Sequence, residues 1–518
     1  MQKIIYTIAL FLGFSAFAIG QSELIIEPGP PGVINAAIAA DTNSLGERND
    51  PNRVYVLRRN FPYILTGTIE FTDFHLRIKA EEGEGARPFI IVDSGAEPVS
   101  QIIRMFGSSD ITLDGLHISG QDILGAYNNR VVRINSDSSQ VFINDCLFEQ
   151  IGQAAVRVQG DNPKIYITNS ILRNIGRPFN PNNGRVFDNR GVPIDTLWMQ
   201  NNVVYNVSQR IYRSGGGSFL NWARFDQNTI WGTGVNGIDF AEIKDLEFTN
   251  NIYANGRFVG AEAERQDTAE TALYWMTVDT FDATVSNYLV SHNNFYTDQE
   301  ILDVFPLQEP DGDTRVTTDG AYLDLQLQAA QTANGTTETN INEPLDFADD
   351  PIINTQFIVA SVLDTPPGGE IPGAEPWDMS DLTLDMNLSA IGTGDVERYT
   401  QVHDFTYSMS AMSATAGTNG QPIGANMELI TSVPDIFVDN RILYYPNPVK
   451  DVLVVQNLEE VNLSRVAVFN ITGQQLLEVT DIDNAALEIN TAQFEAGTYI
   501  LSVMDKAGNV SSRKFMKQ

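Results

Sequence analysis

The feature that most constrains the fold is a short strand motif that recurs between residues 111 and 295. In each copy, two apolar residues flank one residue of any kind, and a further apolar residue follows five positions later. The second apolar position recurs at intervals of 23 to 42 residues, at Leu113, Ile143, Ile167, Met199, Phe225, Phe248 and Val290. Alternation with a period of two is typical of a strand with one buried face. A fixed strand motif at irregular intervals predicts stacked coils joined by variable loops.

Asparagines follow four of these apolar residues at a constant distance of three positions, at Asn202, Asn228, Asn251 and Asn293. Asparagine tolerates left-handed turns, and its amide can bond the asparagine of the next coil, so an internal ladder is predicted. Together with the strand motif, this pattern resembles the right-handed parallel β-helix of the pectate-lyase-like superfamily. The resemblance spans roughly residues 50–300 and concerns the fold, because one fold hosts many activities.

The C-terminal part of the chain has a different character. Short strand-like runs alternate there with turn signals, which predicts a small antiparallel sandwich. Four segments stand in order, namely Tyr445 to Pro448, Val466 to Gln474, Ala496 to Leu501, and Lys514 with Phe515. Their order and spacing resemble the type A C-terminal sorting domain of the type IX secretion pathway. The resemblance implies a partner in the type IX secretion machinery, and a secreted or surface-bound protein of a Gram-negative bacterium. A sugar-binding or Ig-like module is the alternative.

The N-terminal residues have the pattern of a secretory signal. Lys3 precedes the apolar run from Ile4 to Phe17, and small residues precede Gln21, where cleavage is expected. An anchor helix is the alternative, and no transmembrane segment is expected in the mature chain. The chain is thus predicted to be mainly β, with a right-handed parallel β-helix followed by a small C-terminal Ig-like β-sandwich. The predicted parts are a signal peptide at 1–20, a β-helix with an N-terminal cap at 21–305, an acidic irregular region that closes the β-helix and continues as a linker at 306–440, and the sorting domain at 441–518.

Composition excludes several classes of partner. Lys and Arg total 32 against 66 Asp and Glu, which gives a net charge of −34. Such an acidic chain repels nucleic acid and anionic membranes, so neither is expected to bind it. The single cysteine, Cys146, excludes an internal disulfide framework and a cysteine-based zinc site. Only four histidines are present, and a histidine-rich metal centre is not expected.

A row of arginines is predicted on the strand that precedes the motif strand. Arg104, Arg133 and Arg157 each stand between two apolar residues, so their side chains should point outward. Stacking places adjacent members about 5 Å apart, where like charges repel and require an anionic counterpart. That counterpart is either a carboxylate of the chain or a polyanionic ligand such as an acidic polysaccharide, which guanidinium groups bind bidentately. Both alternatives stay open.

The next coils leave the strand register undecided. In one register Phe187 and Tyr212 face outward as flat surfaces for sugar rings, and Asp188 and Arg213 lie inside. Burying these two charges is costly unless they pair. A slip of one residue instead buries both aromatic rings and exposes both charges. Asp188 and Arg213 are neighbours in either register, so an ion pair is expected.

Arg190, Arg210 and the glycines at 215–217 crowd around the same point, which is therefore the predicted site. A polysaccharide lyase must neutralise a uronate carboxylate, remove the C5 proton and protonate the leaving oxygen. β-Helix lyases that this chain resembles use Arg or Lys, together with Ca²⁺ or another basic residue, in this reaction. The resemblance accordingly implies a carboxylate-neutralising role for Arg157, Arg190 or Arg210, proton transfer by Tyr212 or Arg213, and Ca²⁺ held by Asp188 and Asp239. Arg104, Arg133, Arg157 and Phe187 would bind the substrate.

Two other functions are compatible with the sequence. A glycoside hydrolase needs two or three clustered carboxylates. Asp226 and Asp239 are the residues available for it, and the Gly-His-Gly signature of the polygalacturonases is absent from the sequence. A noncatalytic glycan-binding or adhesin-like surface protein is the third reading, because the fold does not determine the function. The prediction is thus an exported protein acting on an acidic polysaccharide, as a lyase, a binding protein or a hydrolase.

Overall fold

The computed structural model describes most of the chain. Described are residues 22–351, 355, 358, 402–427 and 442–517, apart from 44–47, 84, 94, 96–98, 177–182, 217, 235–236, 263–273, 309–311, 317–321, 446–448, 458–462, 471–474, 481, 483–485, 495–496 and 506–509. The predicted signal peptide, most of the predicted linker and the Tyr-Pro-Asn-Pro prolines therefore lie outside the described residues. The chain divides into two compact units, one within residues 22–432 and one within 433–518.

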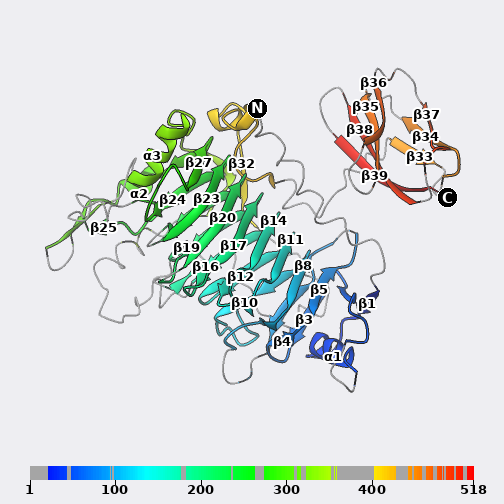
Figure 1. The fold of residues 1–518 in the computed structure, drawn as a ribbon, viewed down its shortest axis with the longest axis horizontal. Coiled ribbons are helices and arrows are strands. Elements are labelled where there is room, and N and C mark those ends of the chain that lie inside the picture. The colour runs from blue at the N-terminus through cyan, green and yellow to red at the C-terminus, as the bar shows by residue number, and fades with distance from the viewer. Residues whose placement is uncertain are drawn as a thin grey trace. The chain divides into compact units, whose positions relative to one another are not determined.

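Three parallel sheets form most of the first unit, and each complete coil contributes one strand to each of them (Figure 1). The ten-stranded sheet consists, in spatial order, of β1 (Glu23–Ile26), β2 (Val54–Leu57), β5 (His75–Ala80), β8 (Asp110–Asp114), β11 (Gln140–Asn144), β14 (Lys164–Thr168), β17 (Ile194–Gln200), β20 (Phe219–Asp226), β23 (Glu242–Thr249) and β27 (Asn287–Ser291). The eight-stranded sheet consists of β4 (Ile69–Thr72), β7 (Ile103–Gly107), β10 (Arg130–Ser136), β13 (Ala154–Val158), β16 (Arg185–Asn189), β19 (Arg210–Arg213), β22 (Ile238–Phe240) and β26 (Met276–Val278). The nine-stranded sheet consists of β3 (Pro62–Leu65), β6 (Phe89–Val92), β9 (His117–Ser119), β12 (Leu147–Ile151), β15 (Ile171–Ile175), β18 (Val203–Val207), β21 (Thr229–Thr233), β24 (Ile252–Gly256) and β28 (Asn294–Tyr296).

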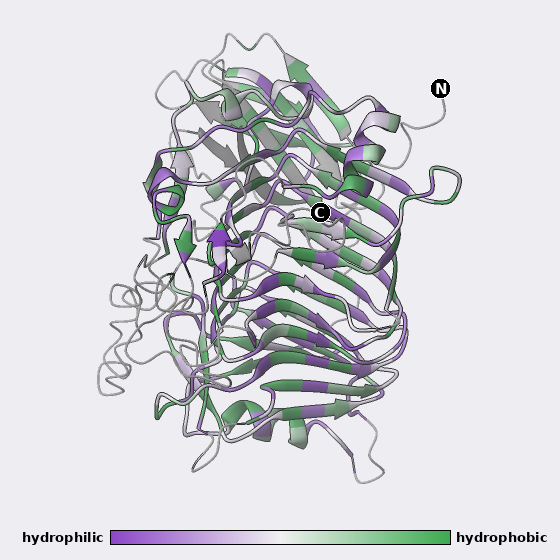
Figure 2. Ribbon diagram, turned by 90° about the vertical axis from the view of Figure 1, so that its left-hand side faces the viewer, coloured by the Kyte–Doolittle hydropathy of each residue, from purple (hydrophilic) through white to green (hydrophobic). Residues whose placement is uncertain are grey.

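The predicted strand motif lies on the ten-stranded sheet. Its second apolar residues pair in register from coil to coil, from Leu113 through to Val290, and all seven are completely buried. Figure 2 shows the stacked coils from the side, with hydrophilic and hydrophobic residues alternating along many strands. The parallel β-helix predicted from the spacing is confirmed, and burial of one face of each strand accounts for the alternation.

The asparagine ladder is confirmed and extends one coil further than predicted. The Nδ2 of Asn228 donates to Oδ1 of Asn251 at 2.9 Å, and that of Asn293 donates to Oδ1 of Asn340 at 3.0 Å. Each of the four predicted ladder residues is the second of a two-residue turn between the ten-stranded and nine-stranded sheets. The first residue of these turns, for example Asn201 or Asn250, has the positive φ instead. The ladder side chains thus satisfy backbone groups inside the turn.

Shorter elements cover the β-helix. The helices are α1 (Val33–Ala40), α2 (Gln299–Leu302) and α3 (Leu325–Asn334), with 3₁₀ turns at Met412–Ala414 and Thr418–Gly420. The small antiparallel pairings involve β25 (Ala261–Glu262), β29 (Leu307–Gln308) and β30 (Thr314–Val316), and then β31 (Phe347–Asp349) and β32 (Asp404–Tyr407).

The described part of the segment 402–427 covers the outer face of the nine-stranded sheet. Phe405 and Ile423 belong to the same hydrophobic cluster as Tyr205 and Trp231 of that sheet. Backbone N–H groups near the end of the segment also bond the sheet's turns, as in Ala425 N to Thr229 Oγ1 at 3.0 Å. The segment therefore covers the outer face of this sheet around Tyr205 and Trp231. The described segments leave outward side chains accessible on the other two sheets.

The second unit contains two antiparallel sheets. One consists of β33 (Ile442–Tyr445), β34 (Val452–Asn457) and β37 (Ala486–Asn490). The other consists of β36 (Gln475–Thr480), β35 (Leu463–Asn470), β38 (Gly497–Asp505) and β39 (Val510–Lys517). Leu453 and Ile489 of the first sheet share one hydrophobic core with Val466 and Leu501 of the second. The small antiparallel sandwich predicted here is thus present, and its Ig-like character remains a prediction.

Candidate functional site

One outward column of the eight-stranded sheet contains most of the predicted site residues. The paired positions on successive strands are Glu70, Arg104, Arg133, Arg157, Asp188, Arg213 and Asp239. The apolar residues beside the arginines, such as Ile103 and Val156, are buried. The outward direction predicted for Arg104, Arg133 and Arg157 is therefore confirmed.

The structure decides the register that the sequence left open. Phe187 pairs with Val156 and Tyr212, and both aromatic side chains are buried, with exposed fractions of 0 % and 1 %. Asp188 and Arg213 lie on the outer side of the same strands. Phe187 can therefore offer no surface to a sugar ring, contrary to its predicted substrate-binding role. The register that buries the rings is favoured because they fill the core between the coils.

Tyr212 is equally unsuited to the proton-transfer role predicted for it. Its hydroxyl lies in the core, where the Nδ2 of Asn189 donates to it at 3.0 Å. Burial raises the pKa of Tyr212 well above its ordinary value, because the phenolate would be desolvated. A buried hydroxyl with a raised pKa does not exchange protons with a ligand on the outer face.

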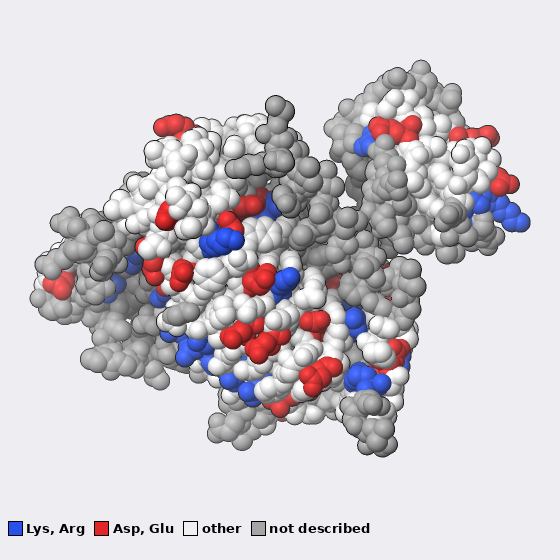
Figure 3. Space-filling view, in the orientation of Figure 1, with Lys and Arg blue, Asp and Glu red and all other residues white. Residues whose placement is uncertain are grey.

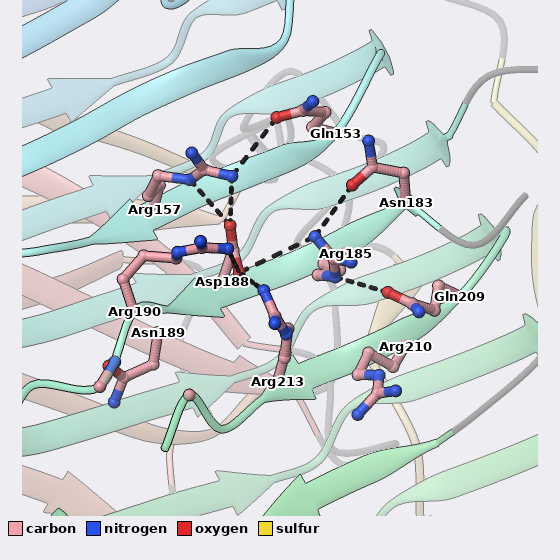
Figure 4. A network of polar contacts seen from close by, with 12 residues as sticks. Gln153, Arg157, Asn183, Arg185, Asp188, Asn189, Arg190, Gln209, Arg210 and Arg213 are labelled. Atoms are coloured by element: carbon pink, nitrogen blue, oxygen red, sulfur yellow. Dashed lines mark hydrogen bonds and ion pairs between the residues drawn. The ribbon is translucent and has the colours of Figure 1, made fainter. Parts of the chain in front are cut away.

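Asp188 lies at the centre of the site (Figure 4). Its Oδ2 accepts hydrogen bonds from Nε of Arg157 at 2.7 Å, and its Oδ1 accepts one from Nη1 of Arg213 at 3.1 Å. The guanidinium groups of Arg185 and Arg190 lie 3.8 and 3.7 Å from the same Oδ1. Burial alone would raise the pKa of Asp188, but the charges of the surrounding arginines outweigh it and lower the pKa. The ion pair predicted between Asp188 and Arg213 is confirmed.

The arginines of this face outnumber its carboxylates. We refer to eight of them as the arginine cluster, namely Arg104, Arg130, Arg133, Arg157, Arg185, Arg190, Arg210 and Arg213. The described carboxylates in salt-bridge distance of this cluster are Glu70, Asp188 and Asp239. Among the described residues, the arginines of this cluster therefore outnumber the carboxylates that contact them, on a chain whose net charge is −34.

Glutamine side chains provide many of the cluster's other hydrogen-bond partners. Nε of Arg133 donates to Oε1 of Gln159 at 2.7 Å, and Nη2 of Arg130 donates to Oε1 of Gln153 at 2.5 Å. Neutral amides position guanidinium groups without cancelling their charge. Burial, followed by repulsion from Arg157 and Arg133, lowers the pKa of Arg130 to about 10. The cluster is thus an ordered region rich in arginine. Arg190 and Arg213 are its more exposed members, with 41 % and 31 % of the side chain exposed.

Arg130 and Arg185 were not found by the reasoning from sequence. They pair in a second column with Ala154 and Arg210. A signal was present, because Arg130, Arg185 and Arg210 each precede the charged residue of the first column by three positions. The glutamine partners had no such signal, since Gln153 and Gln209 lie in the loops before their strands.

The positions predicted for calcium do not form a metal site. The carboxylate of Asp188 is surrounded by guanidinium groups, whose charges disfavour a cation. Asp239 lies two coils away and its Oδ2 accepts a hydrogen bond from Nη1 of Arg210 at 2.8 Å. Among the described residues, no group of three or more His, Cys, Asp or Glu side chains could hold a metal ion.

The carboxylates considered for a glycoside hydrolase are not brought together. Asp226 ends β20 of the ten-stranded sheet, whereas Asp239 lies in β22 of the eight-stranded sheet. Asp226 also bonds its own neighbours, since its Oδ2 accepts from Nη2 of Arg224 at 2.9 Å. A hydrolase needs its two carboxyl groups on either side of one glycosidic bond, and these two residues lie on different sheets.

The comparisons with known proteins concern the end of the chain. Residues 443–518 match the family model of the secretion system C-terminal sorting domain. The chain carries a type IX sorting domain. The matched residues include both antiparallel sheets of the second unit, apart from the first residue of β33. They also contain the four segments between Tyr445 and Phe515 on which the predicted resemblance rests. No curated protein matches the chain in sequence.

The type IX sorting domain establishes where the protein acts. It directs the protein to the type IX secretion machinery and so to secretion or attachment at the outer surface of a Gram-negative bacterium. Within the described residues, every helix is too short or too polar to cross a bilayer. The predictions of localisation and of the secretion partner are therefore confirmed.

Proposed function

We propose that this exported β-helix protein binds an acidic polysaccharide along its arginine cluster. The observation that carries the proposal is the excess of arginine over carboxylate on one sheet of a strongly acidic chain. Neighbouring strands are about 4.8 Å apart, so the guanidinium groups form a regular row of paired donors. Uronate carboxylates and sulfates accept such paired hydrogen bonds.

The energetic reason is the repulsion within the cluster. Burial lowers the pKa of Arg133, and the charges of Arg104 and Arg157 lower it further. An anion on this face relieves that repulsion, whereas the single carboxylate of Asp188 neutralises only part of it. The rest of the acidic surface repels the polymer and confines it to the cluster.

Affinity electrophoresis of the full chain in gels containing pectate, alginate or a glycosaminoglycan tests this function. One polymer should retard the protein, and Arg133→Ala should weaken its binding about tenfold, the loss of one charged hydrogen-bonding group. Arg133→Lys keeps the charge but lacks the planar guanidinium, so its affinity should lie between those of the wild type and of Arg133→Ala. Lys164→Ala, an exposed basic residue on the ten-stranded sheet, is the matched control and should bind as the wild type does. The binding proposal is rejected when no polyanion retards the protein or when both alanine variants bind equally.

Lyase activity is the second candidate, and one observation favours it. Elimination requires a group that neutralises the uronate carboxylate and a base that removes the C5 proton. Burial and neighbouring arginines lower the pKa of Arg130 and Arg185 to about 10, and burial also lowers the pKa of Arg157. The neutral guanidine is the form that accepts a proton, and a lowered pKa makes this form more accessible. In this candidate, Arg190 neutralises the carboxylate and Arg157 acts as the base.

Ultraviolet absorbance separates the two functions. A lyase produces an unsaturated uronate that absorbs, and a binding protein retains the polymer with a flat trace. The assay uses the same polymers with and without Ca²⁺. A dependence on added Ca²⁺ would contradict the reading of Asp188 as a partner of arginines alone.

A further inference from the structure

A row of aromatic side chains lies on the outer face of the ten-stranded sheet, away from the arginine cluster. Phe142, Tyr166 and Trp198 pair in register on the successive strands β11, β14 and β17. Trp222 follows on β20, one column to the side. We call these four residues the aromatic strip. Phe142, Tyr166 and Trp222 are partly exposed, whereas Trp198 is 7 % exposed.

Contacts between the rings order the strip. Phe142 and Tyr166 are stacked, with centroids 5.0 Å apart and planes 9° apart. Trp198 and Trp222 meet edge to face at 5.3 Å. The guanidinium of Arg224 lies 4.5 Å from the ring centroid of Trp198 and also bonds Asp226. The rings are thus held in place before any ligand arrives, which reduces the entropy lost on binding.

Polar and acidic side chains border the strip. Lys164 and Thr196 pair in the column on one side, and Thr168 and Gln200 pair in the column on the other. Burial raises the pKa of Tyr166, and the negative charge of Asp195 adds to the effect. Figure 3 views the face of this sheet and shows acidic and basic side chains dispersed among many uncharged ones.

We propose that the aromatic strip binds an uncharged polysaccharide chain, at a site separate from the arginine cluster. A pyranose ring presents C–H groups on its faces and hydroxyls around its rim. Such rings pack against the exposed parts of an ordered aromatic row that has hydrogen-bonding groups on both sides.

Two observations favour an uncharged glycan over other ligands. Asp195, whose charge acts on Tyr166 of the strip, repels a polyanion, so the ligand differs in charge from that of the arginine cluster. The strip is also one side chain wide for most of its length. A protein partner would need a broader apolar centre, because stable interfaces bury about 1,200–2,000 Å².

The strip is not explained by the stability of the sheet alone. Cross-strand aromatic pairs do stabilise sheets, but polar pairs such as Asn144 with Thr168 also stabilise this outer face. A row of partly exposed aromatic side chains is instead typical of surfaces that bind ligands.

The test is affinity electrophoresis of the full chain in gels containing hydroxyethylcellulose, arabinoxylan or galactomannan. At least one of these uncharged polymers should retard the protein, and Trp222→Ala should weaken that binding about tenfold. Trp222→Phe keeps a flat ring and should retain most of the affinity, which separates loss of stacking from loss of folding. Leu289→Ala, on the same sheet but three coils beyond Trp198, is the control and should bind normally.

The outcomes also distinguish the two sites. Trp222→Ala should leave binding to the acidic polymer unchanged, and Arg133→Ala should leave binding to the uncharged polymer unchanged. Absence of retardation by all three uncharged polymers overturns the proposal. It is likewise overturned when Trp222→Ala alters the sedimentation coefficient of the protein, which would assign the strip to contact between copies of the chain.

Discussion

Asp188 and Arg213 lie side by side on adjacent strands, with Nη1 of the arginine 3.1 Å from Oδ1 of the aspartate. The aspartate side chain is fully buried, whereas 31 % of the arginine side chain is exposed. Asp188 therefore holds the cluster together from beneath, and the arginines around it present their charge to the outside. Of the two counterparts predicted for the arginine row, the carboxylate of the chain is present as Asp188. The external polyanion is the proposal made above.

Asp188→Asn should destabilise the β-helix by about 3–5 kcal/mol, because it removes the buried partner of several guanidinium groups. Urea denaturation followed by circular dichroism measures this loss. Asp239→Asn is the control, since that side chain is 37 % exposed and its pairing with Arg210 should contribute less than about 1 kcal/mol. Equal losses in the two variants would show that Asp188 has no special role in the cluster.

The same substitution should strengthen binding of the acidic polysaccharide. Without Asp188 the cluster loses its internal competitor, so polymer carboxylates face a larger net positive charge. Retention in the gel should therefore be greater for Asp188→Asn than for the wild type. For every variant, retention should fall as the salt concentration rises from 50 to 500 mM, because the Debye length shortens about threefold. Weaker binding by a folded Asp188→Asn protein would mean that Asp188 itself contacts the ligand.

The stability of the β-helix should fall between about pH 4 and pH 2 because of a buried carboxylate on the nine-stranded sheet. Glu149 Oε2 accepts from Nε of Arg173 at 2.7 Å, and its Oε1 lies 2.7 Å from Nε2 of His117. Burial opposes ionisation, but Arg173 and His117 outweigh it and lower the pKa of Glu149 to about 2. The unfolded value is about 4.3, so the stabilisation is present above that pH and is lost as the pH falls through the folded value.

Glu149→Gln tests this assignment by denaturation at a series of pH values. The variant should be less stable than the wild type at pH 6, and the difference should shrink toward pH 2. The double variant Glu149→Gln with Arg173→Leu removes both charges and should recover part of the stability at pH 6. A difference that stays constant over this pH range would exclude Glu149 as the titrating group.

Asn228→Ala should cost more stability than replacement of an asparagine on the surface. Oδ1 of Asn228 accepts from the backbone N of Asn202 at 3.0 Å, and its Nδ2 donates to the carbonyl of Met199 at 3.1 Å. Losing both leaves two buried backbone groups unpaired, at about 1–3 kcal/mol each. Thermal unfolding measures the effect, with Asn144→Ala on the outer face as the comparison. Similar melting temperatures for the two variants would contradict a supporting role for the ladder.

Much of the fold could be predicted from the sequence because its signals are local and repeat. Because one strand face is buried, apolar residues such as Met199 and Phe225 must alternate with other residues along each strand. Each two-residue turn also requires a side chain like that of Asn202, which satisfies the backbone groups of the turn. The sorting domain was likewise recognisable from the order of its segments. The buried ion pairs of Glu149 had no such signal, since their partners come from coils 24 to 32 residues away.

The sequence by itself determined the stacked coils, the outward arginines at Arg104, Arg133 and Arg157, and the address of the protein. Only the tertiary structure decided that Phe187 and Tyr212 point into the core and that Asp188 pairs with four arginines. The physical reason is that a strand has a period of two, so a shift of one residue exchanges its faces. Local alternation is ambiguous where aromatic and charged residues adjoin, and packing against the neighbouring coils resolves it.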